Sequence, residues 1–200
     1  MRNLVLSRVY GEPAICENEI LRYAGCKEAN DATLALMKDC LKKAKEALSY
    51  RVCFCKLPVT VADGVCAIGD LKFRSKDLAI NLNGCDEAIL FAATLGAPFD
   101  RLIAKHSHLS PSVAHMLDAI GTERIEALCD AFCSDIEAET GAALKPRFSA
   151  GYGDLSIEAQ RQIFALLGCE KQIGLTLTDS LIMAPSKSVT AIVGIPTSKT

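Results

Sequence analysis

The chain has 200 residues, of which half are hydrophobic, so it can bury the core of one large domain or of two small ones. Its net charge of -2 and pI of about 5.9 argue against nucleic acid as the main partner, because a phosphate-binding surface shows a basic excess. No stretch reaches the ~18 apolar residues of a membrane span, and the first residues lack a secretory signal core, so we expect a cytoplasmic protein that has no membrane partner.

The first half of the chain mixes short strands with helices. Periodicity and capping residues first predict a strand at 3–10, a helix at 17–24 and a helix that begins at Asn30-Asp31. One face of this second helix carries Leu34, Met37, Leu41, Ala44 and Leu48. A strand at 52–62, a hairpin of 65–68 with 71–74 and a helical turn at 75–82 follow. Gly69-Asp70 is a two-residue hairpin signal.

The second half begins with an apolar run, Ala88–Leu95, which predicts a buried strand. The elements that follow are a helix near 99–106, a long helix from Ser110-Pro111 to Gly141, an extended segment at 144–149, a helix from Ser156 to Gly168, and a terminal hairpin of 181–184 with 188–195. Strands and helices without regular βαβ alternation predict an α+β fold with a mixed or antiparallel twisted sheet and flanking helices. Residues 1–85 and 86–200 are predicted lobes, with one continuous domain as the alternative.

The most informative segment is residues 147–154, with the sequence Arg-Phe-Ser-Ala-Gly-Tyr-Gly-Asp. Arg147 lies at the end of an extended segment, and an arginine can hold a carboxylate through two parallel hydrogen bonds. The two glycines let the backbone approach a ligand, and the ring of Tyr152 can pack on a flat heterocycle or face a cation. S-adenosylmethionine carries a carboxylate, a purine and a positive charge. On local chemistry alone, a glycine-bounded turn with a packed tyrosine is the alternative.

These residues resemble a loop in the reactivation domain of cobalamin-dependent methionine synthase. That domain holds S-adenosylmethionine with an Arg-x-x-x-Gly-Tyr loop, which Arg147, Gly151 and Tyr152 match, and Ser149 falls where the family has a small residue whose backbone faces the ligand. Downstream, Leu177-Thr178-Asp179-Ser180, Met183, Pro185 and Ser188-Val189 resemble that family's Leu-Thr-Glu-Ser, Met-x-Pro and Ser-Val segment. The resemblance spans about residues 117–195 and implies the fold of that domain.

The chain departs from the family pattern at three places. Gly153-Asp154-Leu155-Ser156 stands where the family has Pro-x-Cys-Pro, and the family's late tyrosine has no counterpart among the 200 residues. The family also has an acidic ligand on the preceding helix. An ungapped match places Ser134 there, with Asp130 and Asp135 nearby, so the acidic ligand stays unassigned.

The resemblance implies a partner protein that binds S-adenosylmethionine and supports reductive methylation of cobalamin. The sequence contains no Asp-x-His-x-x-Gly cobalamin motif and no Gly-x-Gly-x-x-Gly after a strand, so the cobalamin is expected on a separate methionine synthase core or corrinoid methyltransferase. A flavoprotein or ferredoxin is the expected electron donor. The alternative function is a docking module that stabilises a corrinoid protein without binding a nucleotide.

A weaker alternative is a metal or redox site. Cys53 and Cys55 share a face of the predicted strand, and Cys129 and Cys133 share a face of the long helix, so the four thiols together are a hypothetical ligand set. The chain has no Cys-x-x-Cys pair, and small buried hydrophobic residues are the favoured interpretation of its ten cysteines. The three histidines are expected at helix ends or on the surface.

Overall fold

The computed structural model describes residues 4–197, which form a six-stranded antiparallel sheet with helices on both faces and a separate two-stranded sheet of β6 and β7. The strands are β1 (Leu6–Tyr10), β2 (Tyr50–Ala62), β3 (Val65–Ile68), β4 (Leu71–Arg74), β5 (Cys85–Thr94), β6 (Thr176–Leu177), β7 (Met183–Ala184) and β8 (Ser188–Pro196). The helices are α1 (Glu17–Tyr23), α2 (Asp31–Lys45), α3 (Lys76–Asn81), α4 (Ala97–Leu109), α5 (Pro111–Thr140), α6 (Ala159–Leu167) and α7 (Cys169–Ile173). The predicted α+β class is therefore confirmed.

The sheet is built around its two longest strands, β2 and β5. The strand order is β4-β3-β2-β5-β8, and β1 also pairs with β2. Because β2 has 13 residues, its first part pairs with β1 and its last part with β3. Residues 88–95 are almost completely buried, since β5 has helices over both faces, and this burial accounts for the continuous apolar run in the sequence.

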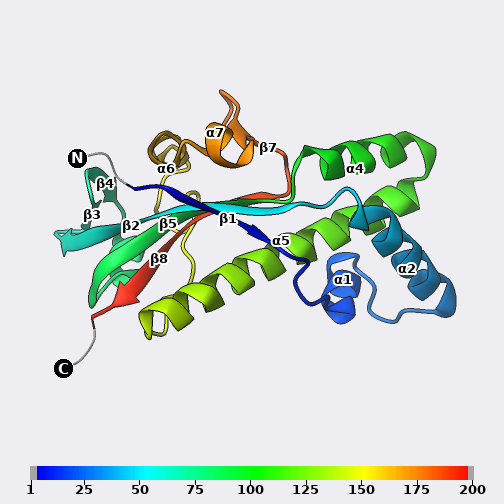
Figure 1. Ribbon diagram of the computed structural model, residues 1–200, viewed down its shortest axis with the longest axis horizontal. Helices are drawn as coiled ribbons and strands as arrows, with labels where there is room; N and C mark the ends of the chain where they lie inside the picture. The colour runs from blue at the N-terminus through cyan, green and yellow to red at the C-terminus, as the bar shows by residue number, and fades with distance from the viewer. Residues whose placement is uncertain (1–3, 198–200) are drawn as a thin grey trace.

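The two helical layers enclose two separate apolar clusters. The long helix α5 crosses one face together with α1, α2 and α4, and α6 and α7 cover the other face (Figure 1). On the α5 side, the ring of Phe132 lies 5.1 Å from that of Phe54 and 4.8 Å from that of Phe91. On the α6 side, Ile163 and Leu167 pack in the same cluster as strand residues of β2, β5 and β8.

The helix ends follow the predicted capping residues. The side chain of Asn30 accepts a hydrogen bond from the Thr33 amide at 2.9 Å, and Gly141 ends α5 in the left-handed conformation with a φ of 66°. Gly168 ends α6 in the same way. The predicted cap of α6 was two residues early: the observed N-cap is Glu158, whose amide donates to Ser156 Oγ at 3.2 Å, and the helix begins at Ala159.

The predicted terminal hairpin is wrong. Residues of β7 pair with β6, and β8 pairs with β5 from Ser188–Thr94 onward. The reason is burial: residues 190–193 of β8 are at most 3% exposed, so this strand belongs in the sheet between the two helical layers. A two-stranded hairpin would instead leave the strand exposed to water.

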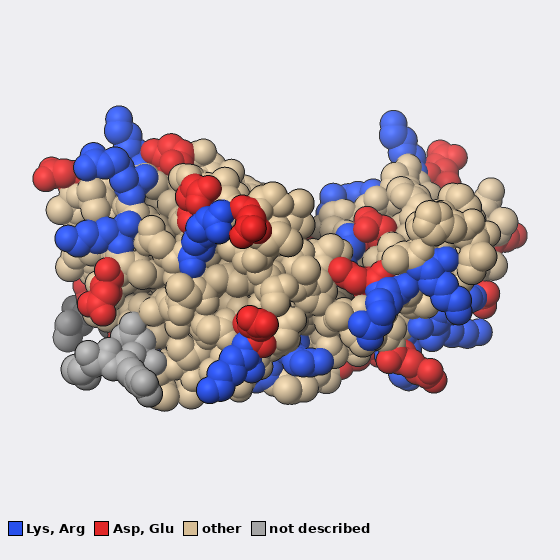
Figure 2. All heavy atoms as spheres, turned by 90° about the horizontal axis from the view of Figure 1, so that it is seen from above, with Lys and Arg blue, Asp and Glu red and all other residues tan. Residues whose placement is uncertain are grey.

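The predicted lobe boundary falls at the start of β5. Residues 51–58 of β2 pair with residues 87–94 of β5, so one sheet contains strands from both sides of this boundary. Figure 2 shows one face of the molecule as two masses with a waist between them, and acidic and basic side chains are spread over both. The division into two lobes stays a prediction. Within residues 4–197, no helix is long and apolar enough to cross a membrane.

Candidate functional site

The segment that follows α5 runs along the outer edge of β8 and then closes into a tight turn. Phe148 exchanges two backbone hydrogen bonds with Ile192, at 2.9 and 2.8 Å, which fixes the segment to the sheet. The Tyr152 amide donates to the Ser149 carbonyl at 3.1 Å, and the Gly151 amide donates to the Leu155 carbonyl at 2.9 Å. The pairing of Phe148 with Ile192 and the two hydrogen bonds within the turn together define the shape of the loop.

Glycine is needed at position 151 of this loop. Its φ of 87° lies in a region that other residues rarely adopt, and an added Cβ would lie 3.2 Å from Ile157 Cδ1. The turn leaves the side chain of Tyr152 69% exposed, with its ring 6.4 Å from that of Phe148 in an edge-to-face arrangement. An exposed ring beside backbone that only glycine permits provides a flat surface for a ligand.

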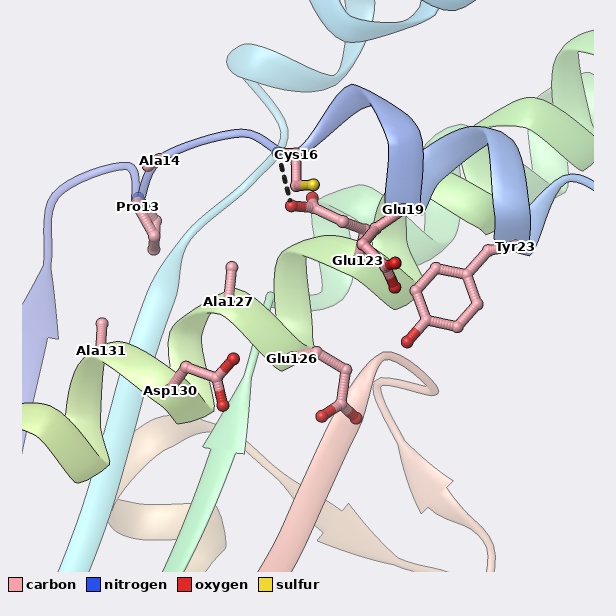
Figure 3. A pocket seen from close by; sticks show the side chains of 10 residues that line it. All are labelled: Pro13, Ala14, Cys16, Glu19, Tyr23, Glu123, Glu126, Ala127, Asp130 and Ala131. Atoms are coloured by element: carbon pink, nitrogen blue, oxygen red, sulfur yellow. Dashed lines mark hydrogen bonds between the residues drawn. The ribbon is translucent and has the colours of Figure 1, made fainter. Parts of the chain in front are cut away.

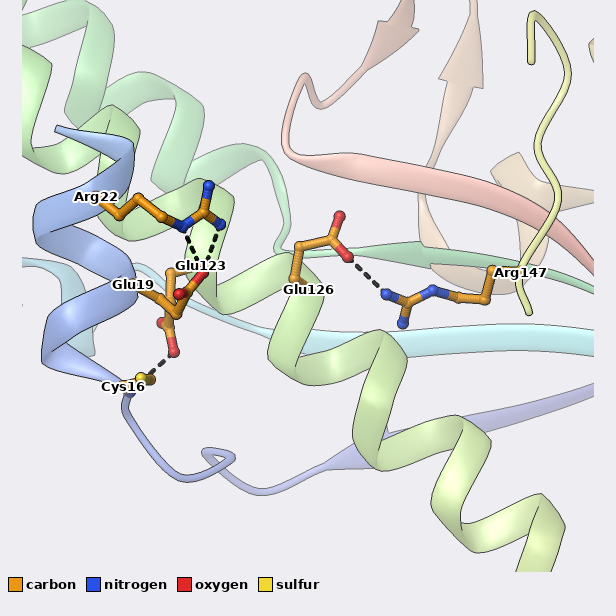
Figure 4. Close-up of polar contacts among 6 residues, drawn as sticks. All are labelled: Cys16, Glu19, Arg22, Glu123, Glu126 and Arg147. Atoms are coloured by element: carbon orange, nitrogen blue, oxygen red, sulfur yellow. Dashed lines mark hydrogen bonds and ion pairs between the residues drawn. The ribbon is translucent and has the colours of Figure 1, made fainter. Parts of the chain in front are cut away.

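Arg147 points from this loop onto α5. Its Nη1 donates to Asp130 Oδ1 at 2.8 Å. Its Nη2 donates to Glu126 Oε2 at 2.7 Å, the contact drawn in Figure 4. Burial opposes the charge on Arg147, but the neighbouring Cys129, Glu126 and Asp130 outweigh this effect and raise the pKa of the guanidinium. The guanidinium is 27% exposed and each carboxylate more so, so all three groups are accessible to a ligand.

The acidic residues that contact Arg147 differ from the residue that the ungapped match placed at the acidic site. Ser134 is exposed, and Asp135 lies 3.9 Å from Arg8, so neither contacts Arg147. Asp130 does, and Glu126 joins it from one helical turn earlier. The sequence interpretation missed Glu126, although its spacing of four residues from Asp130 places both carboxylates on one face of α5.

A cavity of about 550 Å³ lies beside these carboxylates, between α5 and the segment that enters α1 (Figure 3). It is lined by Pro13, Ala14, Cys16, Glu19, Tyr23, Glu123, Glu126, Ala127, Asp130 and Ala131. Four of these residues are acidic and none is basic. Glu19 pairs with Arg22 and Glu123 with Arg124, whereas Glu126 and Asp130 share the single cation Arg147, which leaves one negative charge uncompensated in this group.

The wall of the cavity is held by a buried ion pair. Arg124 is fully buried, pairs with Glu123, and donates to the carbonyls of Pro13 and Ala14, each at 2.7 Å. Glu123 also accepts from the Cys16 amide at 3.0 Å. The pair therefore fixes the path of the chain into α1 and satisfies polar backbone groups that burial would otherwise leave unpaired.

Ser149 lies at a second, smaller hollow of about 250 Å³. Ala150, Ile157, Gln160, Leu181, Met183, Ser188, Val189 and Thr190 also line it. Residues of the downstream motif thus meet the loop here. Ser188 is buried and donates to Thr94 Oγ1 at 2.8 Å, which fastens the start of β8 to β5. The two motifs that are separate in the sequence are neighbours in the structure.

The four cysteines of the metal hypothesis lie on opposite faces of the sheet. Cys53 and Cys55 belong to the cluster under α6 and α7, and Cys129 and Cys133 lie on α5. Burial raises the pKa of Cys129 and of Cys133, which disfavours the thiolate that a metal needs. Within residues 4–197, no three His, Cys, Asp or Glu side chains are grouped in a way that could hold a metal ion.

Comparison with known proteins agrees with this geometry. Residues 142–199, which include the loop and the downstream motif, match the family described as vitamin B12 dependent methionine synthase, activation domain. No curated protein matches the chain. A crystal structure described as the MetH reactivation domain bound to AdoHcy matches with a TM-score of 0.70 and 16% identity, over 100% of this chain and 81% of that one.

These matches define a class of protein. At 16% identity the structural likeness shows the fold, so the whole chain has the fold of a methionine synthase reactivation domain. The family match adds that the segment from 142 onward is similar in sequence to the activation domain. The resemblance predicted from Arg147, Gly151 and Tyr152 is confirmed at the level of the family.

Proposed function

We propose that this chain binds S-adenosylmethionine and supports the reductive methylation of cobalamin held by a separate methionine synthase core or corrinoid methyltransferase. The observation that carries the proposal is the meeting of Arg147 with Glu126 and Asp130 beside an exposed glycine–tyrosine loop. The family match over residues 142–199 and the fold of an AdoHcy-bound reactivation domain support it.

The charges of the group suit an amino acid end. A ligand carboxylate would bind the Arg147 guanidinium, and a ligand ammonium would bind the carboxylates of Glu126 and Asp130, so each charged group of the protein exchanges one partner for another. Because the ligand's amino acid end adds one charge of each sign, the exchange leaves the net charge of the group unchanged and removes no ion from a counter-charge without replacing it. The uncompensated negative charge would also favour the positive sulfonium.

The loop suits the other end of the ligand. The backbone of Ser149 and Gly151 would lie against the nucleoside, and the ring of Tyr152 would pack on the purine. When bound, S-adenosylmethionine supplies a methyl group on an activated sulfur. The chain's own residues bind and orient this donor, and orientation toward a partner's cobalt is the catalytic contribution that they can make. Electrons would come from a flavoprotein or ferredoxin.

Calorimetric titration of S-adenosylmethionine into the protein tests the proposal. We expect saturable binding at one site, weakened about 10- to 150-fold by Arg147→Ala, since a charged hydrogen bond contributes about 1.5 to 3 kcal/mol. Lys43→Ala is the matched control, because it removes an exposed ion pair on α2 far from the loop in sequence. A folded wild-type protein without binding heat at several temperatures would contradict the proposal, as would unchanged affinity in Arg147→Ala.

A second candidate function is a docking module for a corrinoid protein without nucleotide binding. It is favoured by exposed apolar side chains near the loop: Tyr152, Ile157 and Ile182 are 69%, 43% and 63% exposed. In this case a purified corrinoid protein would bind the chain equally well with and without S-adenosylmethionine, and Tyr152→Ser would weaken that binding while Arg147→Ala would not.

A further inference from the structure

Asp154 joins the glycine–tyrosine loop to a helix that is distant in the sequence. Its Oδ2 accepts from the Lys76 amide at 2.8 Å and its Oδ1 accepts from the Asp77 amide at 3.2 Å, at the first turn of α3. Its Oδ1 also accepts from the hydroxyl of Ser75. The contact is reciprocal, because the Asp154 amide donates to Asp77 Oδ2 at 3.2 Å. A loop carboxylate thus satisfies the free backbone amides that begin a helix.

The same helix contacts the beginning of the segment. Asn81, the last residue of α3, donates from Nδ2 to the Pro146 carbonyl at 3.1 Å. Pro146 immediately precedes Arg147, and Asp154 follows Tyr152 by two residues. The helix α3 therefore spans the loop from one end to the other, with the hydrogen bonds of Asp154 at its start and that of Asn81 at its end.

The helix is itself fixed in the core, so it can serve as a brace. The side chains of Leu78 on α3 and of Leu82 at its C-cap are completely buried, and the Ser75 hydroxyl accepts from the Leu78 amide at 3.0 Å. On the loop side, Leu155 is 3% exposed and its amide donates to the Tyr152 carbonyl at 3.0 Å. Asp154 lies between a rigid helix and a buried anchor.

The neighbouring glycine makes the contact close. Gly153 has a φ of 51°, and an added Cβ would overlap the carboxylate of Asp77. The hydrogen bond from Ser75, with those from the two amides, lowers the pKa of Asp154, so the group is ionised at neutral pH. This is the position at which Gly153-Asp154-Leu155-Ser156 departs from the Pro-x-Cys-Pro of the family.

We propose that Asp154 is a positioning residue, which holds the loop of residues 147–152 in its binding geometry by capping α3. The inference rests on the proposed function for the identity of the ligand, but its structural part does not. Asp154 contacts no part of the proposed ligand and acts through Gly151 and Tyr152.

Hydrogen exchange of the Gly151, Tyr152 and Leu155 amides tests the positioning without any ligand. In Asp154→Ala we expect exchange of these three amides to rise about tenfold, because three hydrogen bonds to the cap are lost. The affinity for S-adenosylmethionine should fall by a similar factor. Asp154→Asn keeps one carbonyl oxygen as an acceptor, so its exchange and affinity should lie between those of the wild type and of Asp154→Ala.

Asn30→Ala is the matched control, because it removes the cap of α2 and lowers stability without touching the loop. Equal exchange of the three loop amides in Asp154→Ala and in Asn30→Ala would overturn the proposal, because Asp154 would then contribute stability alone. Faster exchange with unchanged affinity would overturn it as well. A wild type that fails to bind S-adenosylmethionine contradicts the proposed function, and the exchange rates alone then decide for or against Asp154.

Discussion

At the scale of single residues, α5 carries charged groups that do two different tasks. Glu123 and Arg124 are buried and hold backbone, and Glu126 and Asp130, one and two turns further along, are accessible and hold Arg147. Burial gives the two groups different roles. Removing one partner of a buried ion pair leaves the other charge unpaired and without water, which is costly, whereas an exposed ion pair can exchange one partner for a ligand. We therefore assign stability to the first pair and propose ligand binding for the second group.

Removing one member of the buried pair should destabilise the protein strongly. Arg124→Leu leaves Glu123 buried without a counter-charge and leaves the Pro13 and Ala14 carbonyls without donors, so we expect a loss of about 3 to 5 kcal/mol in unfolding free energy. Chemical denaturation measures it. The double variant with Glu123→Leu should be more stable than Arg124→Leu alone. A single-variant loss under about 1 kcal/mol would refute the buried-pair role.

Stability should also fall at alkaline pH. Burial raises the pKa of Tyr50 from 10.0 to about 12, with a smaller opposing effect of Arg124. A raised pKa in the folded state contributes stability that is complete below pH 10 and is lost as the pH rises through 12. For Tyr50 the contribution is about 3 kcal/mol at most. Tyr10 behaves in the same direction.

Denaturant unfolding at a series of pH values, for the wild type and for Tyr50→Phe, measures this loss. The variant cannot ionise at position 50, so its unfolding free energy should fall less steeply between pH 10 and 12. The difference in slope corresponds to the release of up to one proton on unfolding. Identical slopes for the two proteins would show that Tyr50 does not carry the effect.

At the scale of elements, the ends of helices determine where the site residues lie. The long α5 must stop at Gly141 for residues 142–149 to turn back along β8 and carry Arg147 onto the face of α5. The cap depends on the left-handed backbone of Gly141, whose amide donates to the Glu137 carbonyl at 2.8 Å.

A side chain at this cap should therefore be unfavourable. Gly141→Ala has open space for its methyl group, so we expect only the conformational cost of a positive φ, about 1 kcal/mol. Thermal or denaturant unfolding measures the change. Gly11→Ala is the control, since Gly11 also has open space but no positive φ, and its stability should be unchanged or slightly increased. Equal effects of the two substitutions would contradict the role of Gly141.

At the scale of the whole molecule, the central strand pair joins the two predicted lobes. Eight residues of β2 are registered with eight of β5, and β5 is buried on both faces. Without β2, a fragment of residues 86–200 would expose the edge of β5 and the apolar faces of its two clusters to water. From this pairing we expect that residues 86–200 need residues 1–85 in order to fold.

Expression of residues 86–200 alone tests this dependence. We expect a fragment without a cooperative unfolding transition, whereas the full chain should unfold in a single transition. Circular dichroism during thermal and denaturant unfolding distinguishes these cases. A fragment that unfolds cooperatively and binds S-adenosylmethionine would show that residues 86–200 form an independent lobe.

Many of the helices, strands and turns of this protein could be predicted from local sequence patterns. Apolar periodicity placed the long helix and the buried strand β5, and Asn30, Gly69 and Gly141 marked a cap, a turn and a helix end, because such residues act on neighbouring backbone. The spacing of Arg147, Gly151 and Tyr152 indicated the family for the same reason: one continuous loop carries all three.

The tertiary structure decided what depends on residues far apart in the chain. The pairing of β8 with β5, the contact of Arg147 with Glu126, and the capping of α3 by Asp154 join residues separated by 21 to 111 positions, and no local pattern specifies such pairs. They form because the sheet must bury β5 and β8 between two helical layers, which brings α5, the loop and α3 to one edge. The sequence by itself predicted most of the elements and the family resemblance; packing determined which charged groups meet.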